Sequence, residues 1–219
     1  MTKSISLVTA CLAVCATTHA SVTYYDTVGD TFGGVDNLDI TSVDVSHDAD
    51  NVYFTINTAS GFSFPNDWGN YMIAIDAYDG GSGSNPWGRS IDFGGTEIDR
   101  FAGAWVNDGG GALGYHHFDG WYGENEGVSS YYSESGFVSF TFSREWLGSD
   151  VTSFAFDAIT TGSGNTDPGV DHLSRSGQSA DGWGGTSVAG EFLVYNLPAP
   201  GALALLALAG CARGRRRRR

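Results

Sequence analysis

The fold class follows from residues 51–57, Asn-Val-Tyr-Phe-Thr-Ile-Asn, in which Val, Phe and Ile alternate with Tyr, Thr and Asn. Alternation with a period of two is typical of a β-strand that buries one face. In residues 37–45 the apolar residues lie at even positions first, Leu38 and Ile40, and then at odd positions, Val43 and Val45. We therefore expect a second strand there with a bulge near residues 41–42. His-Asp-Ala-Asp at 47–50 closes the hairpin between these two strands.

The rest of the domain repeats this pattern of short strands separated by glycine-rich turns. Further strands are predicted at residues 71–77, 90–93, 104–107, 112–118, 128–134, 137–142, 153–160 and 191–195. Residues 143–147 alone indicate a helix, with Ser143 as its N-cap. Short strands with little helical periodicity predict an all-β fold, a two-sheet antiparallel β-sandwich of jelly-roll or immunoglobulin-like type.

The N-terminus has the pattern of an export signal. Lys3 precedes an apolar segment at 5–16, and Thr-His-Ala at 18–20 ends it with small residues at the positions that a signal peptidase reads. We therefore expect signal peptidase to remove residues 1–20 and residues 21–196 to form one domain. A lipoprotein signal at Cys11 is the alternative, although the apolar stretch before it is short for export.

The C-terminus, residues 197–219, has three consecutive parts. Pro198 and Pro200 frame a Pro-Ala-Pro, an apolar run follows from 201 to 212, and a cluster of arginines ends the chain with Arg215, Arg216, Arg217, Arg218 and Arg219. The apolar run is shorter than the ~20 residues that span a bilayer, so we expect a short apolar helix with only transient membrane association. The arginines would hold the extreme C-terminus on the cytoplasmic side.

This order of proline motif, apolar helix and arginine cluster resembles the PEP-CTERM signals that exosortase-type transpeptidases recognise, with Pro-Ala-Pro in place of the usual Pro-Glu-Pro. The resemblance implies that an exosortase-type transpeptidase removes the tail and that the domain reaches the cell envelope or extracellular matrix. A short anchor that is retained, or a tail replaced by a lipid, are the alternatives.

Acidic residues are concentrated in the predicted domain. All 25 acidic residues of the chain lie there with only four arginines, a formal net charge of −21. This charge excludes nucleic acid as a partner and favours divalent cations as counter-ions. The three cysteines, Cys11, Cys15 and Cys211, lie in the removable ends, so the domain has no disulfide and depends on packing, backbone pairing or bound metal.

The start of the domain resembles a known group of sandwiches. Asp-Thr-Val-Gly-Asp at 26–30, Leu-Asp-Ile-Thr at 38–41 and Asn-Val-Tyr-Phe-Thr-Ile at 51–56 are similar to the first strands of DOMON-like and family-nine carbohydrate-binding-module-like domains. The resemblance covers the first third of the domain. It implies an extracellular β-sandwich that often carries structural calcium and in some relatives binds sugars or haem. Met72 is the only methionine of the domain and lies within a predicted strand, which argues against haem.

Aspartates at turns and strand ends are the candidate calcium ligands. Calcium takes six to eight oxygen ligands from carboxylates and loop carbonyls, and nearby glycines let the backbone turn its carbonyls inward. The candidates are Asp26, Asp30, Asp76, Asp79, Asp157, Asp167 and Asp171. The alternative is that these side chains cap turns by accepting hydrogen bonds from nearby backbone N–H groups.

Aromatic residues in polar, glycine-rich loops are the candidate sugar contacts. They are Trp68, Trp87, Trp121, Tyr122 and Trp183. Flat aromatic faces with a polar rim suit stacking against sugar rings in a polysaccharide. The alternative is that these rings close the ends of the sandwich core.

Catalytic patterns are weak in this chain. Glu124 and Glu126 lie in a predicted glycine-containing loop and could act as the carboxylate pair of glycoside hydrolysis. His116 and His117 are adjacent on a strand and point to opposite faces. The sequence contains no glycine-framed serine elbow or zinc-binding histidine helix, and the triad residue types in 171–174 are too close in sequence to form a relay.

We therefore expect a secreted, non-enzymatic module that acts in adhesion or matrix structure, stabilised by calcium and able to bind polysaccharide. The competing class is a secreted carbohydrate-active enzyme of jelly-roll type. An enzyme needs convergent carboxylates in one groove, whereas a matrix module needs an aromatic platform and metal-bound loops. A surface-layer protein with no specific ligand is the third possibility.

Overall fold

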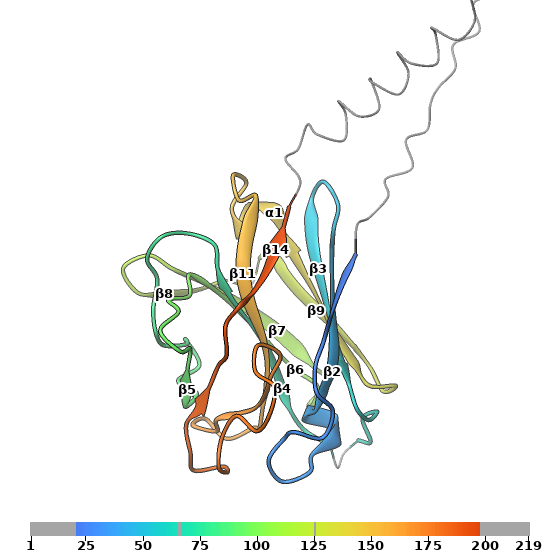
Figure 1. The fold of residues 1–219 in the computed structure, drawn as a ribbon. Helices are drawn as coiled ribbons and strands as arrows, with labels where there is room; N and C mark the ends of the chain where they lie inside the picture. The colour runs from blue at the N-terminus through green and yellow to red at the C-terminus, as the bar shows by residue number, and fades with distance from the viewer. Residues whose placement is uncertain (1–20, 65–66, 125, 198–219) are drawn as a thin grey trace, which may run out of the picture.

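The computed structural model describes residues 21–64, 67–124 and 126–197, and these form an antiparallel β-sandwich (Figure 1). The first sheet has the order β1 (Val22–Tyr25), β2 (Ile40–His47), β3 (Asn51–Thr58), β10 (Phe137–Ser143) and β9 (Val128–Ser133). The second has the order β12 (Gly169–His172), β11 (Ser153–Thr161), β4 (Asn70–Asp76), β6 (Arg100–Trp105), β7 (Gly111–His117) and β8 (Trp121–Glu124). The prediction of an all-β sandwich is confirmed.

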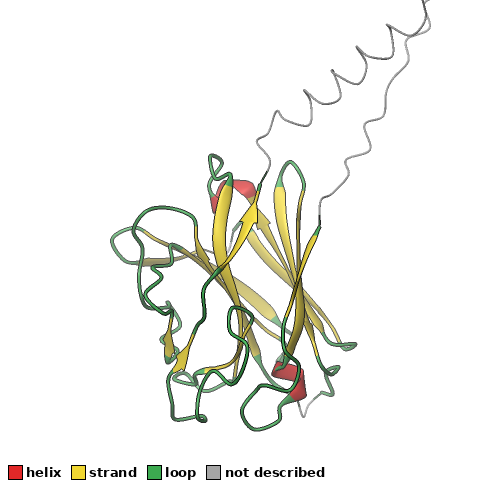
Figure 2. Cartoon of the chain, viewed as in Figure 1, coloured by secondary structure: helices red, strands yellow, loops and turns green. Residues whose placement is uncertain are grey.

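Smaller elements complete the fold. Strand β14 (Leu193–Asn196) also pairs with β11, and β13 (Ser187–Val188) pairs in parallel with β5 (Ile91–Asp92). Helix is confined in the described residues to a 3-10 turn, η1 (Asp36–Leu38), and one short α-helix, α1 (Arg144–Leu147) (Figure 2). No helix among the described residues has the length and apolar character needed to cross a membrane.

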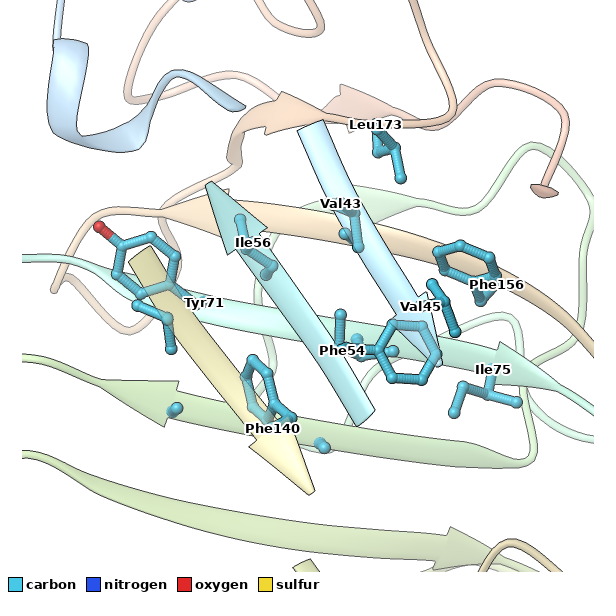
Figure 3. Close-up of a cluster of buried hydrophobic side chains, with 14 of the residues drawn as sticks. Val43, Val45, Phe54, Ile56, Tyr71, Ile75, Phe140, Phe156 and Leu173 are labelled. Atoms are coloured by element: carbon cyan, nitrogen blue, oxygen red, sulfur yellow. The ribbon is translucent and has the colours of Figure 1, made fainter. Parts of the chain in front are cut away.

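The main core lies between the two sheets. Phe54 of β3 and Phe140 of β10 face Ile75 of β4 and Phe156 of β11, and all four side chains are fully buried (Figure 3). Every second residue of β3 is buried, as the alternation in residues 51–57 predicts. Because alternate side chains of a strand point to opposite faces, each strand directs every second side chain into the core. The burial of these apolar side chains holds the two sheets together.

The predicted bulge is present at the start of β2. The pairing of β2 with β3 shifts between Ile40 and Ser42, which places Thr41 outside the regular register. The strand begins later than predicted because residues 36–38 form η1. Thr41 is not left unpaired, since its carbonyl accepts a hydrogen bond from Asp26 N at 3.1 Å. The bulge therefore ties the loop that precedes β2 to the strand itself.

A second apolar cluster covers the outer face of the second sheet. Met72, Phe101 and Ile159 are buried there under the segments that contain β5 and β13. Trp87 lies across β6 at Gly103, where an added Cβ would come within 2.1 Å of the indole ring. Glycine at this position lets the tryptophan close the second cluster.

Four strands were not expected from the sequence: β1, β8, β12 and β13. Strand β8 contains Trp121, Tyr122 and Glu124, so the assignment of Glu124 to a loop is wrong. The prediction for Ser143 is confirmed, because its hydroxyl accepts a hydrogen bond from Trp146 N at 3.0 Å. The predicted signal peptide and the C-terminal apolar helix lie outside the described residues.

The two ends of the sandwich differ in content. The first and last described residues lie at the end that carries α1 (Figure 1). The opposite end carries η1, the connection at 26–39 and the connections at 162–168 and 173–186, and we call it the loop end. Leu197 is buried and donates its backbone N–H to Thr152 O at 2.8 Å, so ordered structure continues one residue beyond the predicted domain.

The core predicts the stability effect of truncation at Phe54. Its ring packs within 6.0 Å, centroid to centroid, of Phe142, Phe154 and Phe156. Phe54→Ala should lower the free energy of unfolding by about 3–5 kcal/mol through lost burial and the cavity left behind. Chemical denaturation of the purified protein measures this. Tyr25→Ala is the control, because that ring is 82% exposed, and it should change stability by less than about 0.5 kcal/mol.

Candidate metal centre

Four aspartates meet at the loop end, at the boundary between the two sheets. Asp26, Asp30 and Asp39 come from the connection between β1 and β2, and Asp171 comes from β12. One carboxylate oxygen from each of Asp30, Asp39 and Asp171 lies within 4.8 Å of the others. Asp26 lies close enough for its charge to act on Asp171. We call these residues the four-aspartate cluster.

The start of β2 explains why these residues meet. Asp171 Oδ2 accepts a hydrogen bond from Ile40 N at 2.6 Å, and Thr160 of β11 donates its hydroxyl to Leu38 O at 2.5 Å. Both bonds link the second sheet to the segment just before and at the bulge. They bring β12 beside Asp39, although residues 39 and 171 are far apart in the sequence.

One oxygen of each loop carboxylate is held by the backbone. Asp39 Oδ2 accepts from Gly29 N at 2.7 Å, and Asp30 Oδ2 accepts from Gly177 N at 2.6 Å. Asp26 Oδ1 accepts from the next backbone N–H at 2.7 Å. Such bonds orient each carboxylate while leaving its second oxygen free for another ligand.

The second oxygens are the unusual feature of the cluster. Asp26 Oδ2, Asp30 Oδ1 and Asp39 Oδ1 are buried and make no hydrogen bond. Asp39 is only 2% exposed. Leaving a buried polar atom unpaired costs free energy, and a charged one costs more, so native proteins pair such groups with donors or metals. Three unpaired oxygens on neighbouring carboxylates are therefore candidate ligand atoms for one cation.

No basic side chain among the described residues forms an ion pair with the cluster. Ion pairs within 4.0 Å among the described residues are Arg100 with Asp99, His116 with Glu124 and His172 with Asp157. None of them involves the four aspartates. Because like charges in a region of low dielectric repel strongly, the cluster needs either protons or a metal cation.

The pKa values of the carboxyls follow from this environment. Burial, together with the charge of Asp30, raises the pKa of Asp26 to about 7. Burial, together with the charge of Asp26, raises the pKa of Asp171 to about 8. Burial also raises the pKa of Asp39.

The four side chains of the cluster offer only oxygen ligands. Oxygen-only ligands of this kind suit a hard divalent cation better than zinc, which prefers histidine and cysteine.

The structure brings together three of the seven aspartates predicted as ligands, namely Asp26, Asp30 and Asp171. Asp39 was not predicted. It lies between Leu38 and Ile40 in the strand predicted at residues 37–45, and in the sequence it has the pattern of an ordinary polar position on the solvent face of a strand. The bulge and the contact with β12 bury it, and neither feature can be read from the local sequence.

Asp157 is buried in a different network. Its Oδ2 lies 2.7 Å from His172 Nδ1, its Oδ1 accepts from Ser174 N at 2.9 Å, and His172 Nε2 lies 2.9 Å from Ser187 Oγ. The residue types are those of a catalytic triad, but Asp157, His172 and Ser187 are all fully buried and no substrate reaches them. An added Cβ at Gly169 would come within 2.2 Å of His172 Nε2, so this network is packed closely.

The other three predicted ligands lie elsewhere. Asp76, at the end of β4, is half-buried, and burial followed by the charge of Asp99 raises its pKa. Asp79 is exposed in the turn that follows. Asp167 Oδ2 accepts from Gly164 N at 2.8 Å, which is the turn-capping role considered as the alternative.

Two of the five predicted sugar-contacting residues meet at the loop end. The rings of Trp68 and Trp183 have centroids 5.6 Å apart and planes tilted by 56°. Trp68 is 37% exposed and Trp183 is 40% exposed. Phe32 packs edge-on against Trp183 with centroids 4.9 Å apart and is itself buried. We call Trp68 and Trp183 the tryptophan pair.

The remaining three aromatic residues lie on other parts of the molecule. Trp87 and Trp121 are partly buried against the second apolar cluster, which is the core role considered as the alternative. Tyr122 is 48% exposed and stacks on His116 with centroids 5.5 Å apart. Among the described residues, the ring contacts of these three side chains are with other aromatic residues and not with Trp68 or Trp183.

A separate acidic cavity of about 460 Å³ lies beside α1. Glu124, Glu126 and Glu145 line it together with Arg100 and His116. His116 Nδ1 lies 2.8 Å from Glu124 Oε1. The cavity thus gathers carboxylates in one groove, which is the arrangement that the enzyme alternative requires.

Comparisons of the chain with protein-family models, curated proteins and solved structures found no match.

The raised pKa values predict how the metal-free protein responds to pH. The folded state holds protons on Asp26 and Asp171 more tightly than the unfolded state does, because their folded pKa values of about 7 and about 8 exceed the usual 3.8. Stability should therefore fall as pH rises from about 5 to about 8.5. Thermal melting of EDTA-dialysed protein across this range measures the slope.

Asp171→Asn, which is neutral at every pH, should make this slope shallower than in the unmodified protein. A melting temperature of the metal-free protein that rises over the same range would contradict the assignment.

Proposed function

We propose that the chain is a secreted, calcium-stabilised β-sandwich that serves as an adhesion or structural module at the cell envelope or extracellular matrix and binds neutral polysaccharide. The observation that carries the proposal is the set of unpaired buried oxygens on Asp26, Asp30 and Asp39 beside Asp171. Calcium suits this set because it accepts carboxylate oxygens in irregular geometry and completes its six to eight ligands with carbonyls and water.

The location of the protein is inferred from its two ends. Residues 1–20 resemble an export signal and residues 197–219 resemble a PEP-CTERM tail, so signal peptidase and an exosortase-type transpeptidase are the proposed processing partners. The described domain ends at Leu197, at the end that carries α1 (Figure 1). A domain attached through that end would direct its loop end away from the envelope.

The proposed ligand surface is the tryptophan pair. Two half-exposed indoles with different tilts offer flat apolar faces beside polar loops, which suits the faces of sugar rings. Asp167 adjoins Trp183, because an added Cβ at Gly162 would contact both side chains. With a domain charge of −21 as well, an acidic polymer would be repelled, so a neutral polysaccharide is the favoured ligand.

The second candidate is a carbohydrate-active enzyme of jelly-roll type that uses the acidic cavity. The pairing of His116 with Glu124 in a groove that also holds Glu126 and Glu145 favours it. The binding module is preferred because, among the described residues, the aromatic side chains near these carboxylates are not free to stack on a sugar ring. Trp146 lines the cavity but is buried, and Tyr122 is stacked on His116.

Calcium should raise the thermal stability of the protein. A ligand present at about 100 times its Kd stabilises the native state by about 2.7 kcal/mol, and each kcal/mol moves the melting temperature of a domain of this size by about 2–4 °C. Asp39→Asn should abolish most of the calcium-dependent rise. Differential scanning calorimetry in EDTA and in millimolar calcium measures it.

Asp79→Asn is the matched control, because this aspartate is exposed and lies outside the four-aspartate cluster. It should keep the full calcium response. No rise in the unmodified protein, or an equal loss in both variants, would count against the calcium site.

Binding to neutral polysaccharide should depend on the tryptophan pair. Trp68→Ala or Trp183→Ala should weaken retention on insoluble cellulose or xylan by about tenfold or more, as expected for loss of a central aromatic contact. Tyr122→Ala is the control, since that ring is exposed on a different part of the molecule, and should leave retention unchanged. A depletion assay with calcium-loaded protein measures this.

The same assay separates the two candidate functions. Release of reducing sugars that Glu124→Gln abolishes would assign the chain to the enzyme class. Retention on acidic polygalacturonate equal to that on cellulose would contradict the preference for neutral polymers.

A further inference from the structure

The connections at 26–39 and 173–186 contribute to both the four-aspartate cluster and the support of the tryptophan pair. The connection at 26–39 carries Asp30, Asp39 and, between them, Phe32. The connection at 173–186 carries Gly177, whose N–H binds Asp30 Oδ2, and also Trp183. Phe32 packs on Trp183. The 26–39 connection therefore supplies three of the four carboxylates and also the apolar contact of Phe32 with Trp183, while Asp171 comes from β12.

Trp68 is attached to the same assembly. Asn37, in η1, donates its side-chain N–H to Trp68 O at 3.0 Å. Asn37 O in turn accepts a hydrogen bond from the buried hydroxyl of Tyr71 at 2.6 Å. The position of Trp68 relative to Trp183 thus depends on where the 26–39 connection lies against the second sheet.

Electrostatics link the two features. Without a cation, ionised carboxylates of the cluster face one another with no basic side chain among the described residues in ion-pair contact with them, and their repulsion opposes the approach of the 26–39 connection to β12. A divalent cation reverses this force and draws the same segments together. Movement of the 26–39 connection moves Phe32, which lies between Asp30 and Asp39 in the sequence and packs on Trp183.

We infer that a cation in the four-aspartate cluster assembles the tryptophan pair, so that ligand binding at Trp68 and Trp183 is calcium-dependent. This inference rests on the proposed calcium site and extends it to the regulation of the ligand surface. Linkage makes the coupling reciprocal: a glycan that binds the assembled pair raises the affinity for calcium by the same factor that calcium raises the affinity for the glycan.

Tryptophan fluorescence of the purified protein tests the coupling without any glycan. Calcium is titrated into EDTA-dialysed protein, and calcium binding is measured separately by calorimetry in each variant. The chain has six tryptophans, and the variants are Trp68→Phe, Trp183→Phe and, as the matched control, Trp121→Phe, which lies against the second apolar cluster. A fourth variant, Phe32→Leu, keeps the carboxylates and alters the contact with Trp183.

The calcium-dependent change in emission should follow the calorimetric binding curve. It should fall by more than half in Trp183→Phe or Trp68→Phe and stay unchanged in Trp121→Phe. Phe32→Leu should bind calcium and show a reduced emission change. These results would support the coupling.

The two proposals fail in different ways. If calorimetry detects no calcium binding and calcium does not raise the melting temperature, the proposed calcium site itself is wrong. If calcium binds and stabilises the protein while the emission change persists in both Trp68→Phe and Trp183→Phe, or is absent in the unmodified protein, the coupling is overturned and the calcium site stands.

Discussion

The loop end of this sandwich depends on buried carboxylates that no basic side chain in the described part of the chain pairs with. Asp39 and Asp171 are each 2% exposed, and Asp26 and Asp30 lie beside them. Backbone N–H groups hold one side of these carboxylates, which fixes their direction but does not remove their repulsion. A cation bound by these carboxylates would replace their mutual repulsion, which costs folding free energy, with a crosslink between the two sheets. That role matters in a domain that has no cysteine to form a disulfide.

The bulge in β2 makes this arrangement possible. Without the register shift between Ile40 and Ser42, the side chains on either side of it would keep one alternation along the whole strand. With the shift, Ile40 N is available to Asp171, and Thr41 O is available to the backbone of Asp26. A local irregularity in one strand thus gathers aspartates from segments far apart in the sequence.

Local patterns account for what the sequence could predict. The alternation in residues 51–57 and the N-cap at Ser143 depend on neighbouring residues, and both agree with the structure. Strands β1 and β12 have four residues each, too few to show a clear period, and their pairing depends on distant partners. Asp39 was missed for the same reason, since its burial depends on β12.

The candidate sites show the same division between composition and position. Composition indicated aspartates and tryptophans as candidate ligand-binding residues, but not which of them lie close together. Asp167 caps a turn and Trp87 closes an apolar cluster, although both lie in loops of the same character as Asp30 and Trp183. The type of a residue determines what its side chain can bind. Which side chains come together in one site depends on how the strands pair and on which loops therefore lie side by side.

The separation of the two ends gives the domain a direction. The chain leaves the described domain at Leu197, beside α1, while the four-aspartate cluster and the tryptophan pair lie at the loop end (Figure 1). If the C-terminal tail tethers the domain as proposed, the loop end is the end farther from the point of attachment. Calcium links these facts if it orders the loops only where it is abundant, because the ligand surface would then be assembled after export and not before it. The acidic charge that repels copies of the domain from one another would at the same time keep that surface open to neutral chains.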